Sequence, residues 1–112
     1  MVSRVEPGDL RVEQGQKRVR TYLGGHLVAD TIRPLLVWEI PHYPTYYLPL
    51  ADVRAELVPA GSDPDDGAEV FDVRTPGGLA PGAARRYLES PAPPLREAVR
   101  LEWSAMTEWL EE

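Results

Sequence analysis

Residues 18–30 read RVRTYLGGHLVAD and carry the clearest fold signal in the chain. Two short runs of alternating apolar and polar residues flank a Gly-Gly pair, and a type I′ two-residue β-turn requires a positive φ at both of its central positions. The pattern predicts a β-hairpin that turns at this pair. Its first strand would place Val19, Thr21 and Leu23 on one face, because successive side chains of a strand point to opposite sides.

The sequence on either side of this hairpin also favours strands. Apolar, β-branched or alternating runs predict strands, whereas runs rich in glycine and proline predict loops. The expected strands cover residues 10–13, 35–40, 45–48, 53–58, 69–74 and 85–89, and the expected loops cover residues 59–67 and 75–84. Twelve prolines argue against a helical bundle, because each removes a backbone donor. The expected fold class is mainly β, with α+β at the margin, in a single domain over residues 1–112 whose first 17 residues form a polar leader.

The C-terminal segment from residue 93 fits two structures. Its apolar residues follow a helical stripe, which would make one long helix. Val99, Leu101 and Trp103, separated by charged residues, fit a strand equally well. In that case Ser104 would cap a helix from Ala105 to Glu111, because its hydroxyl would satisfy a free backbone N–H. The residues alone leave both structures open.

Composition excludes several function classes. The net charge is −6, and an acidic protein repels phosphate backbones and anionic lipids, so we expect no nucleic-acid partner and no membrane partner. No apolar run approaches the ~20 residues that span a bilayer, and no signal peptide is evident, which favours a cytoplasmic protein. The absence of cysteine excludes disulfides, thiolate metal sites and thiol catalysis.

The remaining residues offer no metal or cofactor motif. The acidic run DPDDG at residues 63–67 would need an oxygen ligand at its fifth position and glutamate at its twelfth to bind calcium as an EF-hand does, and it has glycine and arginine there. His26 and His42 alone fall short of a zinc site. No phosphate-binding or dinucleotide-binding glycine motif occurs. We therefore expect no metal and no cofactor.

The strongest candidate for a site is residues 38–48, WEIPHYPTYYL, which hold four of the nine aromatic residues. Glu39 lies in an apolar run, and burial would raise its pKa and make it a usable general acid or base. His42 lies three residues further on, in a proline bend, and would assist proton transfer if the bend brings it against Glu39. The competing interpretations are an ion pair of Glu39 with Arg33 or Arg54, and an exposed loop histidine.

The adjacent tyrosines of this stretch must point to opposite faces of their strand. One of Tyr46 and Tyr47 is expected to pack in the core with Trp38, and the other to line a concave surface and offer its hydroxyl to a ligand. The candidate ligand-binding residues are therefore Trp38, Glu39, His42, Tyr46 and Tyr47.

Several stretches together resemble the domain of unknown function family 427. The run GGHLVADT at 24–31 is similar to a turn of that family, and residues 35–49 reproduce its order of an apolar strand, a glutamate, a proline bend, a Tyr-Tyr pair and a proline. The Asp-Val-Arg at 52–54 follows as in the family. Residues 99–112 resemble the close of the first domain in two-domain actinobacterial members.

This resemblance implies a compact fold of twisted, mostly antiparallel sheets, akin to the β-tent group, with a strand over 99–103 followed by a short C-terminal helix. Many members carry a Cys-Pro-x-Lys-Gly segment where this chain has residues 63–67, and β-tent relatives often hold zinc on four cysteines that this chain lacks. The resemblance therefore implies a fold and a pocket location, and no reaction.

Two functions follow from these observations. The first is a small-ligand binding or interaction module with a cleft lined by aromatic residues and a glutamate. The alternative is an enzyme that uses Glu39 as general acid or base, assisted by His42, Tyr46 or Tyr47. The apolar residues near the C-terminus suggest a partner surface, either for a homodimer or for a second domain of the same family; they are Trp103, Met106, Trp109 and Leu110.

Overall fold

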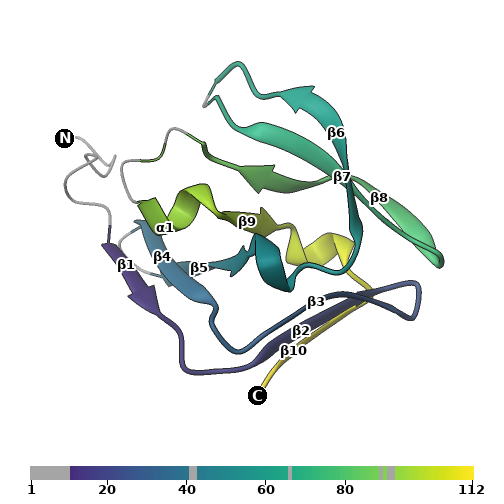
Figure 1. Ribbon diagram of the computed structural model, residues 1–112, viewed down its shortest axis with the longest axis horizontal. Coiled ribbons are helices and arrows are strands. Elements are labelled where there is room, and N and C mark those ends of the chain that lie inside the picture. Colours follow the sequence, from purple (N-terminus) through teal and green to yellow (C-terminus); the bar gives the residue numbers. More distant parts are fainter. Residues whose placement is uncertain (1–10, 41–42, 66, 89, 91–92) are drawn as a thin grey trace.

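The chain forms two antiparallel sheets, which confirms the expected mainly β fold (Figure 1). The computed structural model describes residues 11–40, 43–65, 67–88, 90 and 93–112. The larger sheet has the strand order β1-β4-β5-β9-β8-β7-β6, and the smaller has the order β10-β2-β3. Their bounds are β1 Arg11–Gln14, β2 Val19–Leu23, β3 His26–Thr31, β4 Leu35–Ile40, β5 Tyr43–Pro49, β6 Glu56–Ser62, β7 Glu69–Thr75, β8 Gly78–Arg86, β9 Ala98–Leu101 and β10 Glu108–Glu111. The helical segments are the 3₁₀ turns η2 Leu50–Asp52 and η3 Trp103–Ala105 and the short helix α1 Pro93–Arg96.

The predicted hairpin is confirmed as β2 and β3. Gly24 and Gly25 turn between the strands with φ of 61° and 82°, which a side chain would make costly. Val19, Thr21 and Leu23 are buried, as their alternation predicts, and the residues between them are partly exposed. This buried face lies against the larger sheet.

The core fills the space between the two sheets. Burial of apolar side chains from both sheets is the main favourable term in folding. The small sheet contributes Val19, Leu23, Val28 and Ala29, and the large sheet contributes Leu48, Val73, Ala80, Ala83, Ala84, Val99 and Leu101, with Met106 beside them.

A second, smaller core lies on the opposite face of the large sheet. Leu95 of α1 packs there with Val37 of β4, Tyr47 of β5 and Ala98 of β9. Since Leu48 belongs to the first core, neighbouring residues of β5 are buried on opposite faces. β5 is therefore covered on both faces, and the side chain of Tyr46 points to the same face as that of Leu48, opposite to Tyr47.

The turn of the first hairpin contacts the turn between β7 and β8. The Thr75 hydroxyl donates a hydrogen bond to the Leu23 carbonyl oxygen at 2.8 Å. Gly24 and Gly77 approach so closely that a Cβ built on Gly77 would lie 2.1 Å from the Gly24 carbonyl oxygen. The two sheets are thus held together at this end by backbone contacts that only glycine permits.

The predicted boundaries on either side of β7 were wrong. The expected loop over 75–84 forms most of β8. That strand ends at Arg86, whereas the sequence predicted a strand up to residue 89. β6 continues to Ser62, through the first part of the loop expected over 59–67. The alanines of β8 have low strand propensity, but their small side chains are buried between the sheets, and packing overrides propensity. Pro81 and Gly82 lie where the register between β7 and β8 shifts, and Gly82 has a φ of 63°. The missing N–H of Pro81 therefore removes no hydrogen bond from the regular part of the ladder.

The predicted C-terminal helix from Ala105 to Glu111 was also wrong. The strand expected at 99–103 is present as β9, but only the 3₁₀ turn η3 follows it, and residues 108–111 form β10. β10 pairs with the free edge of β2, with Glu111 opposite Val19, and so satisfies backbone groups that would otherwise lack partners. Figure 1 shows β10, in yellow, lying along β2 and ending at the C-terminus.

Candidate functional site

A groove of about 350 Å³ opens between β5 of the large sheet and β10 of the small sheet. This volume is within the range of small-molecule sites. Three aromatic side chains and one carboxylate dominate its lining. The lining residues are Pro44, Thr45, Tyr46, Leu101, Trp103, Trp109 and Glu111.

Tyr46 lines the groove because successive side chains of β5 point to opposite faces of the sheet, and the face of Tyr46 is the one on which the groove opens. Tyr47 points to the opposite face and is 1% exposed in the second core, where its ring centroid lies 6.2 Å from that of Tyr87. Tyr46 is half-buried and packs against the edge of the first core. The sequence predicted that one of the two tyrosines would line a concave surface, and that tyrosine is Tyr46.

Glu111 joins the two sheets at the groove. The Tyr46 hydroxyl donates a hydrogen bond to Glu111 Oε1 at 3.1 Å, and Trp109 Nε1 donates to Glu111 Oε2 at 3.0 Å. The Tyr46 and Trp109 rings lie 6.4 Å apart between centroids, tilted by 46°. One carboxylate therefore holds both rings, and residues 65 positions apart in the sequence meet at one place.

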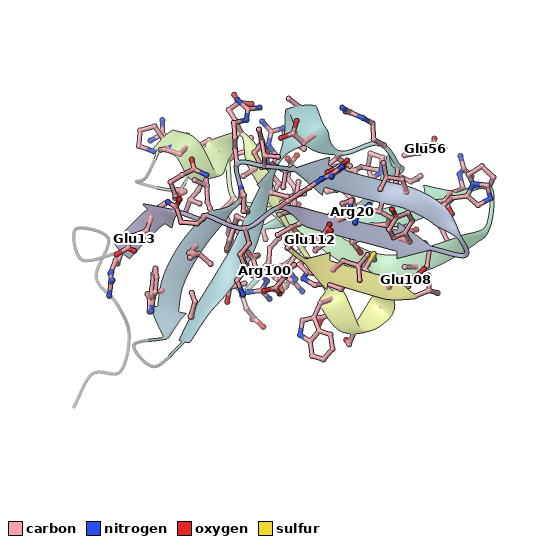
Figure 2. All side chains as sticks on the ribbon, turned by 90° about the horizontal axis from the view of Figure 1, so that it is seen from below. Glu13, Arg20, Glu56, Arg100, Glu108 and Glu112 are labelled. Atoms are coloured by element: carbon pink, nitrogen blue, oxygen red, sulfur yellow. The ribbon has the colours of Figure 1, made fainter. Side chains whose placement is uncertain are left out.

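The electrostatics of the groove are those of a negative site. Burial raises the pKa of the Tyr46 hydroxyl above its ordinary value, and the charge of Glu111 and the hydrogen bond to it raise that pKa further. Glu111 itself forms no ion pair with any lysine, arginine or histidine in the described part of the chain. Its neighbour Glu112 instead pairs with Arg20, and Figure 2 shows these two labelled residues side by side on the small sheet. Among the described residues, the negative charge of Glu111 therefore has hydrogen-bond donors but no cationic partner.

Trp103 completes the aromatic lining. It begins η3, directly after β9, and its side chain is 68% exposed. An exposed tryptophan beside two other rings is unusual for a surface that only faces water, because large aromatic side chains stabilise a protein mainly when buried.

The sequence of this chain places it in a known family. A family model described as a domain of unknown function, DUF427, matches residues 11–111. This chain belongs to the DUF427 family. The match runs from the first residue of β1 to the last of β10, so every groove residue of this DUF427 domain lies within it. A comparison with curated proteins gave no match.

Of the other predicted site residues of the DUF427 domain that the structure describes, Trp38 and Tyr47 lie outside the groove. Trp38 lies on β4 beneath the guanidinium of Arg11, whose carbon is 4.1 Å from the ring centroid. It therefore does not pack with Tyr47, contrary to the prediction that it shares the core with a tyrosine. The side chain of Glu39 and the whole of His42 lie outside what the structure describes.

The arginines proposed as partners of Glu39 have other contacts. Arg33 lies 3.5 Å from Asp52, and Arg54 donates a hydrogen bond to the Ala51 carbonyl oxygen at 2.8 Å. The acidic loop also has a partner, because Asp63 pairs with Arg85 at 2.8 Å.

Within the described residues no group of three or more histidines, aspartates or glutamates has the arrangement to hold a metal ion. No helix among them is both long enough and apolar enough to cross a bilayer.

Sequence reasoning missed three groove residues as site residues. Trp103, Trp109 and Glu111 belong to the C-terminal segment, whose spacing was interpreted as a helical stripe or a partner surface. The signal was present as two tryptophans and a glutamate within nine residues. Only the folded chain, in which these residues line one groove with Tyr46 of β5, shows that they share a site.

Proposed function

We propose that this DUF427 domain is a small-ligand binding module and that its site is the groove between β5 and β10. The observation that supports this most is the Glu111 carboxylate, which takes one hydrogen bond from Tyr46 and one from Trp109. This arrangement fixes two rings in advance, and a ligand then binds without the cost of ordering them. A concave apolar lining with few polar groups is what small-molecule sites generally offer.

Binding accounts for the groove better than acid–base catalysis does. Apart from the weakly acidic hydroxyl of Tyr46, the described residues of its lining include one titratable side chain, Glu111, and no histidine, lysine or arginine. Proton transfer usually needs a second group poised to accept or return the proton. The alternative enzyme, with Glu39 and His42 as its acid–base pair, draws no support from the described residues.

The three tryptophans provide a direct test of the site. Trp103 and Trp109 line the groove, whereas Trp38 lies under Arg11 on β4, so its indole N–H signal is an internal control. A fragment library screened by two-dimensional NMR should yield compounds that shift the indole signals of Trp103 and Trp109 in a saturable way and leave Trp38 unchanged. Screening that yields no such compound, or that shifts all three signals alike, would contradict the proposal.

A second copy of the chain is the competing occupant of these aromatic residues. Trp103 is 68% exposed and Leu110 is 37% exposed, so both are available for self-association. Sedimentation over the concentration range of the NMR experiment separates the two uses of the surface. A monomer whose indole signals respond to a fragment supports ligand binding, and a dimer that dissociates on Trp103→Ala would oppose it.

A further inference from the structure

The groove combines three aromatic side chains with a carboxylate that has no cationic partner among the described residues, and this combination determines which ligands it favours. Tyr46 and Trp109 are held 6.4 Å apart, and Trp103 lines the same groove. The faces of aromatic rings carry partial negative charge and attract cations, tryptophan most strongly. Glu111 adds a full negative charge between the rings. The lining therefore favours a cation over a neutral ligand of equal size.

The same lining disfavours anions. Among its described residues it contains no lysine, arginine or histidine, and the hydroxyl of Tyr46 and the indole N–H of Trp109 already donate to Glu111. A phosphate or carboxylate would meet the negative charge of Glu111 and two donors that are already occupied. Like charges repel, so the described lining disfavours anionic ligands.

The hydrogen bonds within the groove distinguish among cations. Each oxygen of Glu111 already accepts one bond from a ring donor, so the carboxylate keeps only about two of its four acceptor positions for a ligand. A primary ammonium presents three N–H groups and requires several acceptors, whereas a quaternary ammonium has none to satisfy. A quaternary ammonium binds through its charge and through contact with ring faces, which are the two properties this groove supplies. The net charge of −6 on the whole chain also raises the local concentration of cations.

We propose that the ligand of this groove is a small quaternary ammonium compound, with its methylated nitrogen against Tyr46, Trp103 and Trp109 and its charge facing Glu111. This assignment rests on the proposed function, because it names the class of ligand for the same site. A cavity of about 350 Å³ accepts a trimethylammonium group with a short substituent.

Choline and 3,3-dimethylbutan-1-ol form a matched pair for the test, because they have the same shape and differ in the charge at one atom. Titration calorimetry should show choline binding about tenfold more tightly than the neutral alcohol, which is the ratio expected for a cation among aromatic faces. Glu111→Gln should remove most of this preference. Glu108→Gln removes the same charge from the same strand outside the groove and should leave the preference within about twofold.

A second variant keeps the test decisive if Glu111→Gln fails to fold. Trp103 is 68% exposed, so Trp103→Ala should leave the fold intact while it weakens choline binding about three- to tenfold. Unchanged choline binding in a folded Trp103→Ala variant would overturn the placement of the methylated nitrogen.

The outcomes separate the ligand class from the proposed function. Equal binding of choline and the neutral alcohol would overturn the assignment of a quaternary ammonium ligand, while the proposal that the groove binds small ligands would stand. Binding of a peptide with trimethylated lysine, without any response to choline, would overturn the assignment to a small compound. Failure of choline, the alcohol and every fragment to shift the Trp103 and Trp109 signals would overturn the proposed function itself.

Discussion

The Tyr46–Glu111 hydrogen bond allows a quantitative test of the groove geometry. Tyr46→Phe removes the hydroxyl and leaves the ring that packs against the first core. A hydrogen bond to a charged group contributes about 1.5–3 kcal/mol when it is buried. Here Glu111 is exposed and the bond is 3.1 Å long, so water competes for the carboxylate. We therefore expect a loss of about 0.5–1 kcal/mol in the free energy of unfolding at pH 7.

The pH dependence of this difference is the more specific readout. Burial and the charge of Glu111 raise the pKa of Tyr46 in the folded protein above its unfolded value of about 10. A raised folded pKa stabilises the protein fully below the unfolded pKa, and this contribution is lost as the pH rises through the folded pKa. The advantage of the wild-type protein over Tyr46→Phe should therefore be constant from pH 7 to about 9 and decline above pH 10.

Urea unfolding followed by tryptophan fluorescence measures both quantities. With a slope of about 1–3 kcal/mol/M, the expected loss shifts the midpoint by a few tenths of a molar unit. Tyr22→Phe is the matched control, because the Tyr22 hydroxyl makes no side-chain hydrogen bond within the described residues, and it should change the free energy of unfolding by less than about 0.5 kcal/mol. An advantage of the wild-type protein that stays constant from pH 7 to pH 11.5 would refute the account of Tyr46.

Three further predictions concern the scaffold that positions the groove. Gly77→Ala should cost about 2–3 kcal/mol, because its Cβ would overlap the Gly24 carbonyl oxygen and separate the two hairpin turns, and urea unfolding measures this loss. Leu95→Ala should cost about 2–4 kcal/mol in the same assay, because it opens a cavity in the second core. Asp30→Asn should destabilise the folded protein at pH 7, because the hydrogen bonds from Arg18 hold the pKa of Asp30 below its ordinary value. The stability that this ion pair contributes is present above pH 3.8 and is lost as the pH falls through the lowered pKa of Asp30.

The two packing predictions have a comparison variant, and the prediction for Asp30 has a pH readout. Gly25→Ala places a side chain at a positive φ of 82°, which Gly77 does not have, but its Cβ meets no atom within 4 Å, so it should cost only about 1–2 kcal/mol. A larger loss than for Gly77→Ala would oppose the steric explanation. Leu79→Ala, at an exposed position, should cost less than about 0.5 kcal/mol. For Asp30→Asn, a difference from wild type that persists undiminished at pH 2 would contradict the role assigned to Arg18.

Local patterns in the sequence were sufficient for the hairpin and for the fold class. The Gly-Gly pair of β2 and β3 needs a backbone conformation that few other residues adopt, so the turn is encoded within two residues. The alternation of Val19, Thr21 and Leu23 specifies the buried face without reference to any partner. The same geometry required Tyr46 and Tyr47 to face opposite ways.

Strand boundaries near β8 and β10 depended on the tertiary structure. The alanines of β8 favour a strand only because β7 and β9 lie on either side and the small sheet covers them. Residues 108–111 carry no strong strand signal, and they pair with β2 because its free edge would otherwise leave backbone groups without partners. Neither neighbour can be recognised from the residues themselves.

What the sequence alone determined is a mainly β chain with one tyrosine of the Tyr46–Tyr47 pair turned out of the core. The packing of the two sheets then selects the neighbours of that tyrosine: Tyr46 contacts Trp109 and Glu111, whereas Trp38 lies beneath Arg11. The physical reason is that side-chain direction follows from the local backbone, whereas contacts across 65 residues follow from how the two sheets pair and pack.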